Sequence, residues 1–177
     1  MIHPGDRTPP PTPAQLADAL RVLNHHGVDF VLIGGVAATL HGSSIPTFDL
    51  DIAYARDPAN IGRLVKALKE LNAELRVGGE PPDEPLVFIL DEKSIEMGAN
   101  FTFVTTSGAV DVLGDPGGIS SYSDLRNGAT EETLLGEPIK LVSLDHLIAM
   151  KRHANRAKDK LALEELKVIA DEGRSRS

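Results

Sequence analysis

Two aspartates separated by one residue stand out in the segment Phe48-Asp49-Leu50-Asp51-Ile52. Side chains alternate along a β-strand, so both carboxylates lie on one face and their apolar neighbours on the other. Their Cβ atoms are then roughly 6.7 Å apart, from a rise of about 3.3 Å per residue. Burying two like charges without a cation is costly, and carboxylate ligands favour a hard divalent cation, Mg²⁺ in particular. The spacing therefore predicts a metal-binding pair.

A third aspartate has similar surroundings in Ala109-Val110-Asp111-Val112-Leu113, where Asp111 faces away from its two valine neighbours. An inward charge that protects a sheet edge is an alternative explanation for any one of these acids. Three carboxylates on apolar strands together favour a shared site.

A glycine pair, Gly34-Gly35, follows the apolar segment Phe30-Val31-Leu32-Ile33 and precedes a short helix over 36–41. Such a turn lets a phosphate approach backbone N–H groups and the positive end of a helix. Close packing of strand against helix is the alternative explanation, since glycine has no side chain.

These segments together resemble the nucleotidyltransferase signature: Ile33-Gly34-Gly35-Val36-Ala37, then His41-Gly42-Ser43, then Thr47-Phe48-Asp49-Leu50-Asp51-Ile52. The segments 136–140, 144–151 and 156–159 are similar to the C-terminal part of minimal bacterial nucleotidyltransferases, including AbiEii/MenT-like toxins of type IV toxin–antitoxin systems. The resemblance covers about residues 15–170. It implies a polymerase-beta-like nucleotidyltransferase fold.

The resemblance also implies roles for particular residues. Asp49 and Asp51 correspond to the metal ligands and, with Asp111 as third acid, form the catalytic set. The nucleotide-binding residues it implies are Gly34, Gly35 and Thr47. Lys151, on the predicted helix after Ser143, is a further candidate phosphate contact. For Lys151, a surface lysine on an amphipathic helix is the alternative explanation.

One departure concerns position 45, where many family members carry arginine and this chain carries Ile45. We expect Lys151, Arg56 or Lys140 to supply the missing triphosphate contact, or the activity to be reduced.

The implied reaction transfers a nucleoside monophosphate from an NTP, with Mg²⁺ or Mn²⁺ as cofactor and pyrophosphate as leaving group. The implied acceptor is a macromolecular hydroxyl, either the 3′ end of tRNA or a partner protein, in a toxin with a cognate antitoxin. Self-modification at Ser43, Ser44 or Tyr54 is a further alternative. Two other readings stay open: a catalytically silent fold kept as a binding or regulatory module, and a small-molecule (antibiotic) adenylyltransferase.

The elements that position these residues predict an α+β fold. We expect a small mixed sheet of about four or five strands with helices mainly on one side. Strands are predicted over 30–33, 48–54, 86–90, 101–104, 109–113, 133–135 and 139–142, and helices from Thr12 to Gly27, over 36–41, from Pro58, from Ser143 and over 157–171. The predicted organisation is a proline-rich arm (1–13), a nucleotidyltransferase core (14–142) and a C-terminal helical segment (143–177).

Composition limits the alternatives. The 177 residues are 41% hydrophobic and 25% charged, which is typical of a globular domain, and without cysteine any metal must bind oxygen or histidine. No apolar run is long enough to cross a bilayer, so we expect a cytoplasmic protein with no membrane contact. Residues 1–150 carry a charge of −11 and residues 151–177 carry +3, so an RNA would contact Lys151, Arg152, Arg156 and Lys158.

Overall fold

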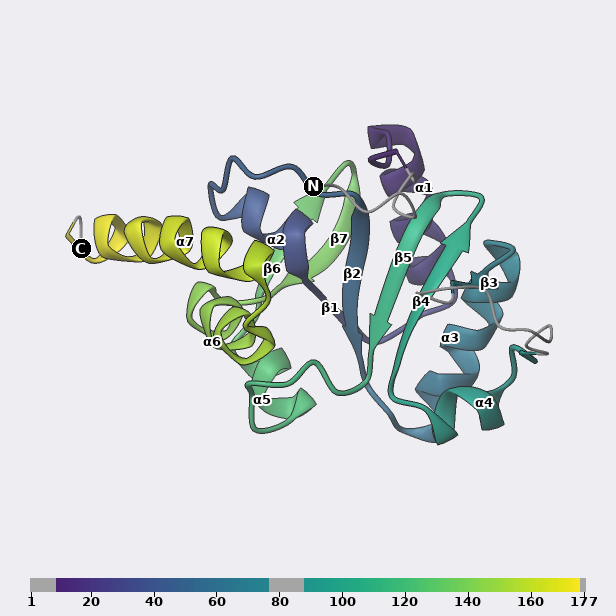
Figure 1. Cartoon of the computed structure of the whole chain (residues 1–177). Helices are drawn as coiled ribbons and strands as arrows, with labels where there is room; N and C mark the ends of the chain where they lie inside the picture. The colour runs from purple at the N-terminus through teal and green to yellow at the C-terminus, as the bar shows by residue number, and fades with distance from the viewer. Residues whose placement is uncertain (1–8, 77–87, 176–177) are drawn as a thin grey trace.

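The computed structural model describes residues 9–76 and 88–175, and its elements are shown in Figure 1. The helices are α1 (Pro13–His25), α2 (Gly34–Leu40), α3 (Pro58–Glu70), α4 (Glu92–Met97), α5 (Tyr122–Asn127), α6 (Leu144–Ala154) and α7 (Ala157–Ser175). The strands are β1 (Phe30–Ile33), β2 (Asp49–Tyr54), β3 (Glu74–Leu75), β4 (Asn100–Thr105), β5 (Gly108–Leu113), β6 (Thr130–Leu134) and β7 (Glu137–Leu141).

The strands form one mixed sheet in the order β3-β4-β5-β2-β1-β7-β6. β2 lies at the centre, antiparallel to β1 and parallel to β5, and β1 is parallel to β7. The sheet has seven strands rather than the four or five expected, because the two-residue β3 and the β6–β7 hairpin extend its edges. Of the strand predicted over 86–90, residues 86–87 lie outside the described residues, and residues 88–90 are not in a strand.

The unit β1-α2-β2 carries the glycine pair. All four residues of β1 are buried, as the continuous apolar segment predicts. Gly34 turns the chain with φ +68°, a conformation that glycine adopts readily, and α2 begins there rather than at Val36. The chain then returns through residues 43–48, which lack regular secondary structure, into β2.

The helices begin at residues whose side chains satisfy free backbone N–H groups. Thr12 and Gln15 form a capping box at α1, and Asp57 accepts a hydrogen bond at the start of α3. Figure 1 shows α1, α3 and α4 on one side of the sheet and α2, α5, α6 and α7 on the other, so the expectation of helices mainly on one side is wrong.

Ser143 caps α6 as predicted, and Asn155, with φ +49°, ends it just before α7. The six-residue helices α4 and α5 were not expected, since each is too short to show a helical apolar period. The predicted domain boundaries stay predictions. Within the part of the chain that the structure describes, no helix has the length and apolarity that crossing a membrane requires.

Candidate active site

The three aspartates predicted from the sequence lie together. β2 and β5 pair in parallel with Asp51 opposite Asp111, so the two carboxylates lie on the same face of neighbouring strands. Asp49, two residues before Asp51, shares that face. One carboxylate oxygen from each residue lies within 4.8 Å of the others, and all three side chains are half-buried.

The glycine pair packs directly against this cluster. A Cβ on Gly34 would lie 2.1 Å from Asp51 Oδ2, and the backbone N–H of Gly35 donates to the same oxygen over 3.4 Å. A Cβ on Gly35 would lie 2.3 Å from Thr47 Oγ1. The close-packing explanation of the glycine pair therefore has a structural basis, whereas its role as a phosphate turn stays a prediction.

Thr47 lies immediately before the acid strand. Its hydroxyl donates to the Asp49 carbonyl oxygen over 3.2 Å and lies 3.5 Å from Asp49 Oδ1. Thr47 therefore helps to fix the backbone from which the first carboxylate projects.

A cavity of about 490 Å³ opens over the acid cluster. Its acidic wall holds the three aspartates, and its opposite wall is formed by the end of α6 and the start of α7. Three cationic residues line it: Arg76, Lys151 and Arg156. Carboxylates facing cations across a cavity can hold a metal-bound polyphosphate between them.

Two of these cations are held by one buried acid. Asp159 has a fully buried side chain and accepts from Lys151 Nζ over 3.0 Å and from Arg156 Nε over 2.7 Å. Burial raises the pKa of Asp159, but the hydrogen bonds from Arg156 and Lys151 outweigh it, and the pKa lies below its ordinary value. Asp159 is thus a carboxylate that orients both cations.

Burial and the charges of its neighbours act together on Asp51. Burial raises its pKa to about 8, with Asp49 and Asp111 adding to the shift, while the Gly35 N–H and Lys151 act in the other direction. The hydrogen bond to Asp159 raises the pKa of Arg156, and the charges of Asp51 and Asp49 add to that shift. A divalent cation would relieve the repulsion among the carboxylates, so the all-oxygen donor set fits Mg²⁺ or Mn²⁺.

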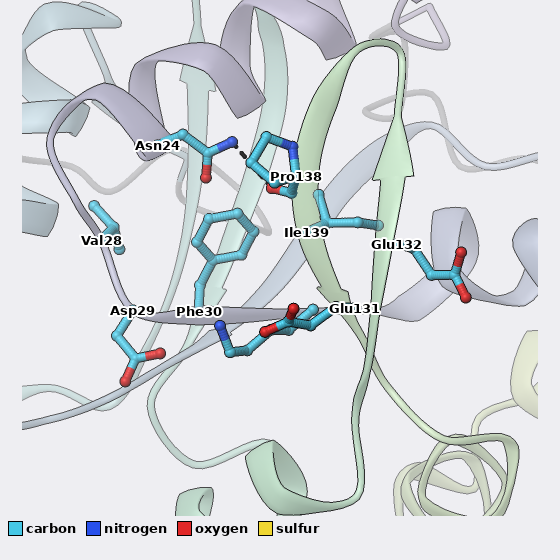
Figure 2. A pocket seen from close by; sticks show the side chains of 9 residues that line it. Asn24, Val28, Asp29, Phe30, Glu131, Glu132, Pro138 and Ile139 are labelled. Carbon is cyan, nitrogen blue, oxygen red and sulfur yellow. Dashed lines mark hydrogen bonds between the residues drawn. The ribbon is translucent and has the colours of Figure 1, made fainter.

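Of the cations expected to compensate for Ile45, only Lys151 lines the acid cavity among the described residues. Arg56 donates to the carbonyl oxygens of Glu96 and Gly98 near α4. Lys140 lines a separate hollow of about 210 Å³ between the end of α1, the start of β1 and the β6–β7 hairpin. Figure 2 shows this hollow, with the hydrogen bond from Asn24 to Pro138 at its edge.

The residues considered for self-modification have different surroundings. Tyr54 is fully buried and its hydroxyl donates to the Ala99 carbonyl oxygen, so it is closed to modification in this structure. Ser43 is buried and Ser44 exposed, and both hydroxyls donate to Glu165 on α7.

Sequence reasoning missed Asp159 and Arg76 as cavity residues and treated Arg156 only as an RNA contact. The signal for Asp159 was its position three residues after Arg156 and eight after Lys151, at the start of the last helix. The sequence held no comparable signal for Arg76.

The structure is similar over nearly its whole length to solved structures of nucleotidyltransferases. The lincosamide antibiotic adenylyltransferase LnuA, bound to lincomycin, has a TM-score of 0.60 at 16% identity, over 90% of this chain and 99% of that chain. ANT(2″)-Ia in complex with adenylyl-2″-tobramycin has a TM-score of 0.54 at 14% identity, over 93% and 97%. An antigenic nucleotidyltransferase-like protein from Paracoccidioides brasiliensis has a TM-score of 0.51 at 16% identity, over 91% and 77%.

No family model matches the sequence, and no curated protein matches it significantly. The structural similarity shows that the chain has the nucleotidyltransferase fold, which confirms the predicted fold class.

Proposed function

We propose that this chain is a metal-dependent nucleotidyltransferase that transfers a nucleoside monophosphate from an NTP to a hydroxyl group. The observation that carries the proposal is the cavity in which Asp49, Asp51 and Asp111 face Lys151 and Arg156. A bound divalent cation would neutralise charge on the triphosphate and polarise its α-phosphorus. Asp49 and Asp51 are the ligands proposed to hold it.

In the proposed step the acceptor oxygen forms a bond to the α-phosphorus of the NTP, and the bond from that phosphorus to the pyrophosphate oxygen breaks. Asp111 accepts the proton of the attacking hydroxyl. Lys151 and Arg156, oriented by Asp159, stabilise the negative charge that develops on pyrophosphate. Gly34 and Gly35 leave room for a phosphate beside the backbone N–H groups.

For the acceptor, the sequence resemblance supports a macromolecular hydroxyl, either the 3′ end of tRNA or a partner protein, in a cytoplasmic toxin with an antitoxin. A small-molecule hydroxyl is the second candidate. Among the similar structures, LnuA is a lincosamide antibiotic adenylyltransferase bound to lincomycin, and ANT(2″)-Ia, an antibiotic-resistance factor, is in complex with adenylyl-2″-tobramycin.

The test is incubation with each labelled NTP and Mg²⁺ together with total tRNA, cell lysate, lincomycin or tobramycin, and identification of the labelled product. Transfer should require the divalent cation and be abolished in Asp49→Asn, whose fold should stay intact by circular dichroism. Transfer in EDTA, or by the Asp49→Asn variant, would refute the proposal. Folded protein that labels no acceptor and binds no NTP would favour the silent binding module.

If tRNA is the acceptor, few phosphate contacts should hold it, because residues 1–150 are strongly acidic. The slope of log K against log salt should be only about −2 to −4, as for three or four neutralised phosphates. Arg152→Glu, an exposed position on α6, should raise the KM for tRNA without changing NTP binding. If a lysate protein is labelled and Arg152→Glu has no effect on the KM for tRNA, the acceptor is a protein rather than tRNA.

A further inference from the structure

One wall of the acid cavity is a segment without regular secondary structure. Residues 43–48, here called the β2-entry loop, lead from α2 into β2. Five of its six residues line the cavity: Ser43, Ile45, Pro46, Thr47 and Phe48. Such a segment keeps its shape only where side-chain contacts hold it, because no helix or strand ladder fixes its backbone.

Contacts hold the β2-entry loop at both ends. At its C-terminal end, the Thr47 hydroxyl bonds to Asp49 and packs against Gly35. At its N-terminal end, the Glu165 carboxylate accepts three hydrogen bonds: from Ser43 Oγ over 2.5 Å, from the Ser44 N–H over 2.8 Å and from Ser44 Oγ over 2.7 Å. These bonds lower the pKa of Glu165, so the carboxylate is charged at neutral pH.

The segment between these two ends carries the apolar part of the wall. Ile45 lies between these two ends, and its backbone N–H donates to Ser43 Oγ over 3.3 Å. The same Ser43 hydroxyl donates to the Glu165 carboxylate. Ile45 and Pro46 have no side-chain donor for a phosphate, and the cavity's cations lie on other elements. Under the proposed function, this part of the wall suits contact with the nucleobase or ribose rather than with the triphosphate.

We propose that Glu165 is a positioning residue for nucleotide binding: it fixes the β2-entry loop so that the Ile45–Pro46 wall is formed before the nucleotide arrives. The inference rests on the proposed function. Releasing the loop adds an ordering cost to NTP binding, because its residues must then be fixed on binding. It leaves the triphosphate contacts intact, since Lys151 and Arg156 are oriented by Asp159.

The experiment measures equilibrium binding of each Mg²⁺-NTP and of Mg²⁺-tripolyphosphate to the full chain. Glu165→Ala should weaken binding of the preferred NTP roughly tenfold, since reordering one or two residues costs about that factor or more. Binding of tripolyphosphate should change by less than about twofold, because that probe lacks a base and a ribose. Glu165→Gln should restore most of the affinity, since an amide can accept from Ser44 and donate to Ser43 Oγ.

The matched control is Glu164→Ala, which removes the same charge from the neighbouring position of α7. The Glu164 side chain is 77% exposed and pairs with Lys167 over 3.2 Å, so this variant should bind like the wild type. Amide hydrogen exchange gives a second readout, since Glu165→Ala should speed exchange at Ser44 and Ile45 and Glu164→Ala should not.

The inference is overturned if Glu165→Ala binds NTP like Glu164→Ala, or if tripolyphosphate binding weakens in parallel. The second result would mean that the whole cavity has lost its shape. A wild-type protein that binds tripolyphosphate and no NTP would overturn the proposed function together with this inference. If the wild type binds NTP and Glu165→Ala gives either of the first two results, only the role of Glu165 is overturned and the proposed function stands.

Discussion

Replacement of Asp51 by asparagine should make the metal-free protein more stable, by an amount that grows with pH. Burial and the neighbouring carboxylates raise the pKa of Asp51 from 3.8 to about 8 in the folded chain. Between these two values the folded state therefore holds a proton at Asp51 that the unfolded state has released. Unfolding releases that proton, so the wild type loses stability as pH rises through this window. The amide of the Asp51→Asn variant does not titrate, and it keeps an oxygen that accepts from the Gly35 N–H.

The size of the effect follows from linkage. One additional proton in the folded state changes the free energy of unfolding by about 1.4 kcal/mol per pH unit, so the advantage of Asp51→Asn should grow by roughly 3 kcal/mol from pH 5 to pH 7. Urea unfolding in EDTA, followed by far-UV circular dichroism at pH 5, 6 and 7, measures this difference. Asp171→Asn, an exposed carboxylate on α7, shows what loss of a surface charge does in the same assay.

A stability difference between Asp51→Asn and wild type that stays constant from pH 5 to pH 7 would refute the reasoning. Addition of Mg²⁺ provides a second check. Metal binding needs the charged form of Asp51, so Mg²⁺ should stabilise the wild type more at pH 8 than at pH 6 and should leave Asp51→Asn almost unaffected.

Three further predictions concern the surroundings of the cluster. Gly34→Ala should abolish transfer and destabilise the fold, because its Cβ would lie 2.1 Å from Asp51 Oδ2 at a residue with φ +68°; activity and urea unfolding measure this. Gly62→Ala, with open space around its Cβ on α3, should instead stabilise the fold by up to about 1 kcal/mol in the same unfolding assay, and a loss there would contradict the helix assignment. Asp159→Asn should lower stability by about 1–3 kcal/mol and raise the KM for NTP, because Lys151 loses its buried partner; an unchanged KM would count against the proposed role of that lysine.

The pair Asp49 and Asp51 could be placed from the sequence because alternation along one strand is a local property. The position of Asp111 beside Asp51 could not, since it depends on the register between β2 and β5, which are separated by α3, α4 and two other strands. The strand pattern only favoured a shared site, and the resemblance to a known signature named Asp111 as its third acid.

The cations illustrate the same limit. The sequence made Lys151 the candidate phosphate contact but left Lys140 open as an alternative. Lys140 lines the same hollow as Phe30, the first residue of β1, whereas the acid cavity is lined by Ile33, at the other end of that strand. Asp159 meets Lys151 because the turn at Asn155 brings the start of α7 back to the end of α6. Sequence spacing alone does not show that contact.

Because Asp51 and Asp111 lie opposite each other on neighbouring strands, the metal site forms only when β2 and β5 pair in the correct register. A shift of one residue between β2 and β5 would move Asp111 to the opposite face of the sheet and leave Asp51 beside an apolar side chain. Chains misfolded in this way would hold at most two of the three carboxylates together. A divalent cation present during refolding should therefore favour correctly aligned molecules selectively, so that the ion acts on folding yield before it acts on any substrate.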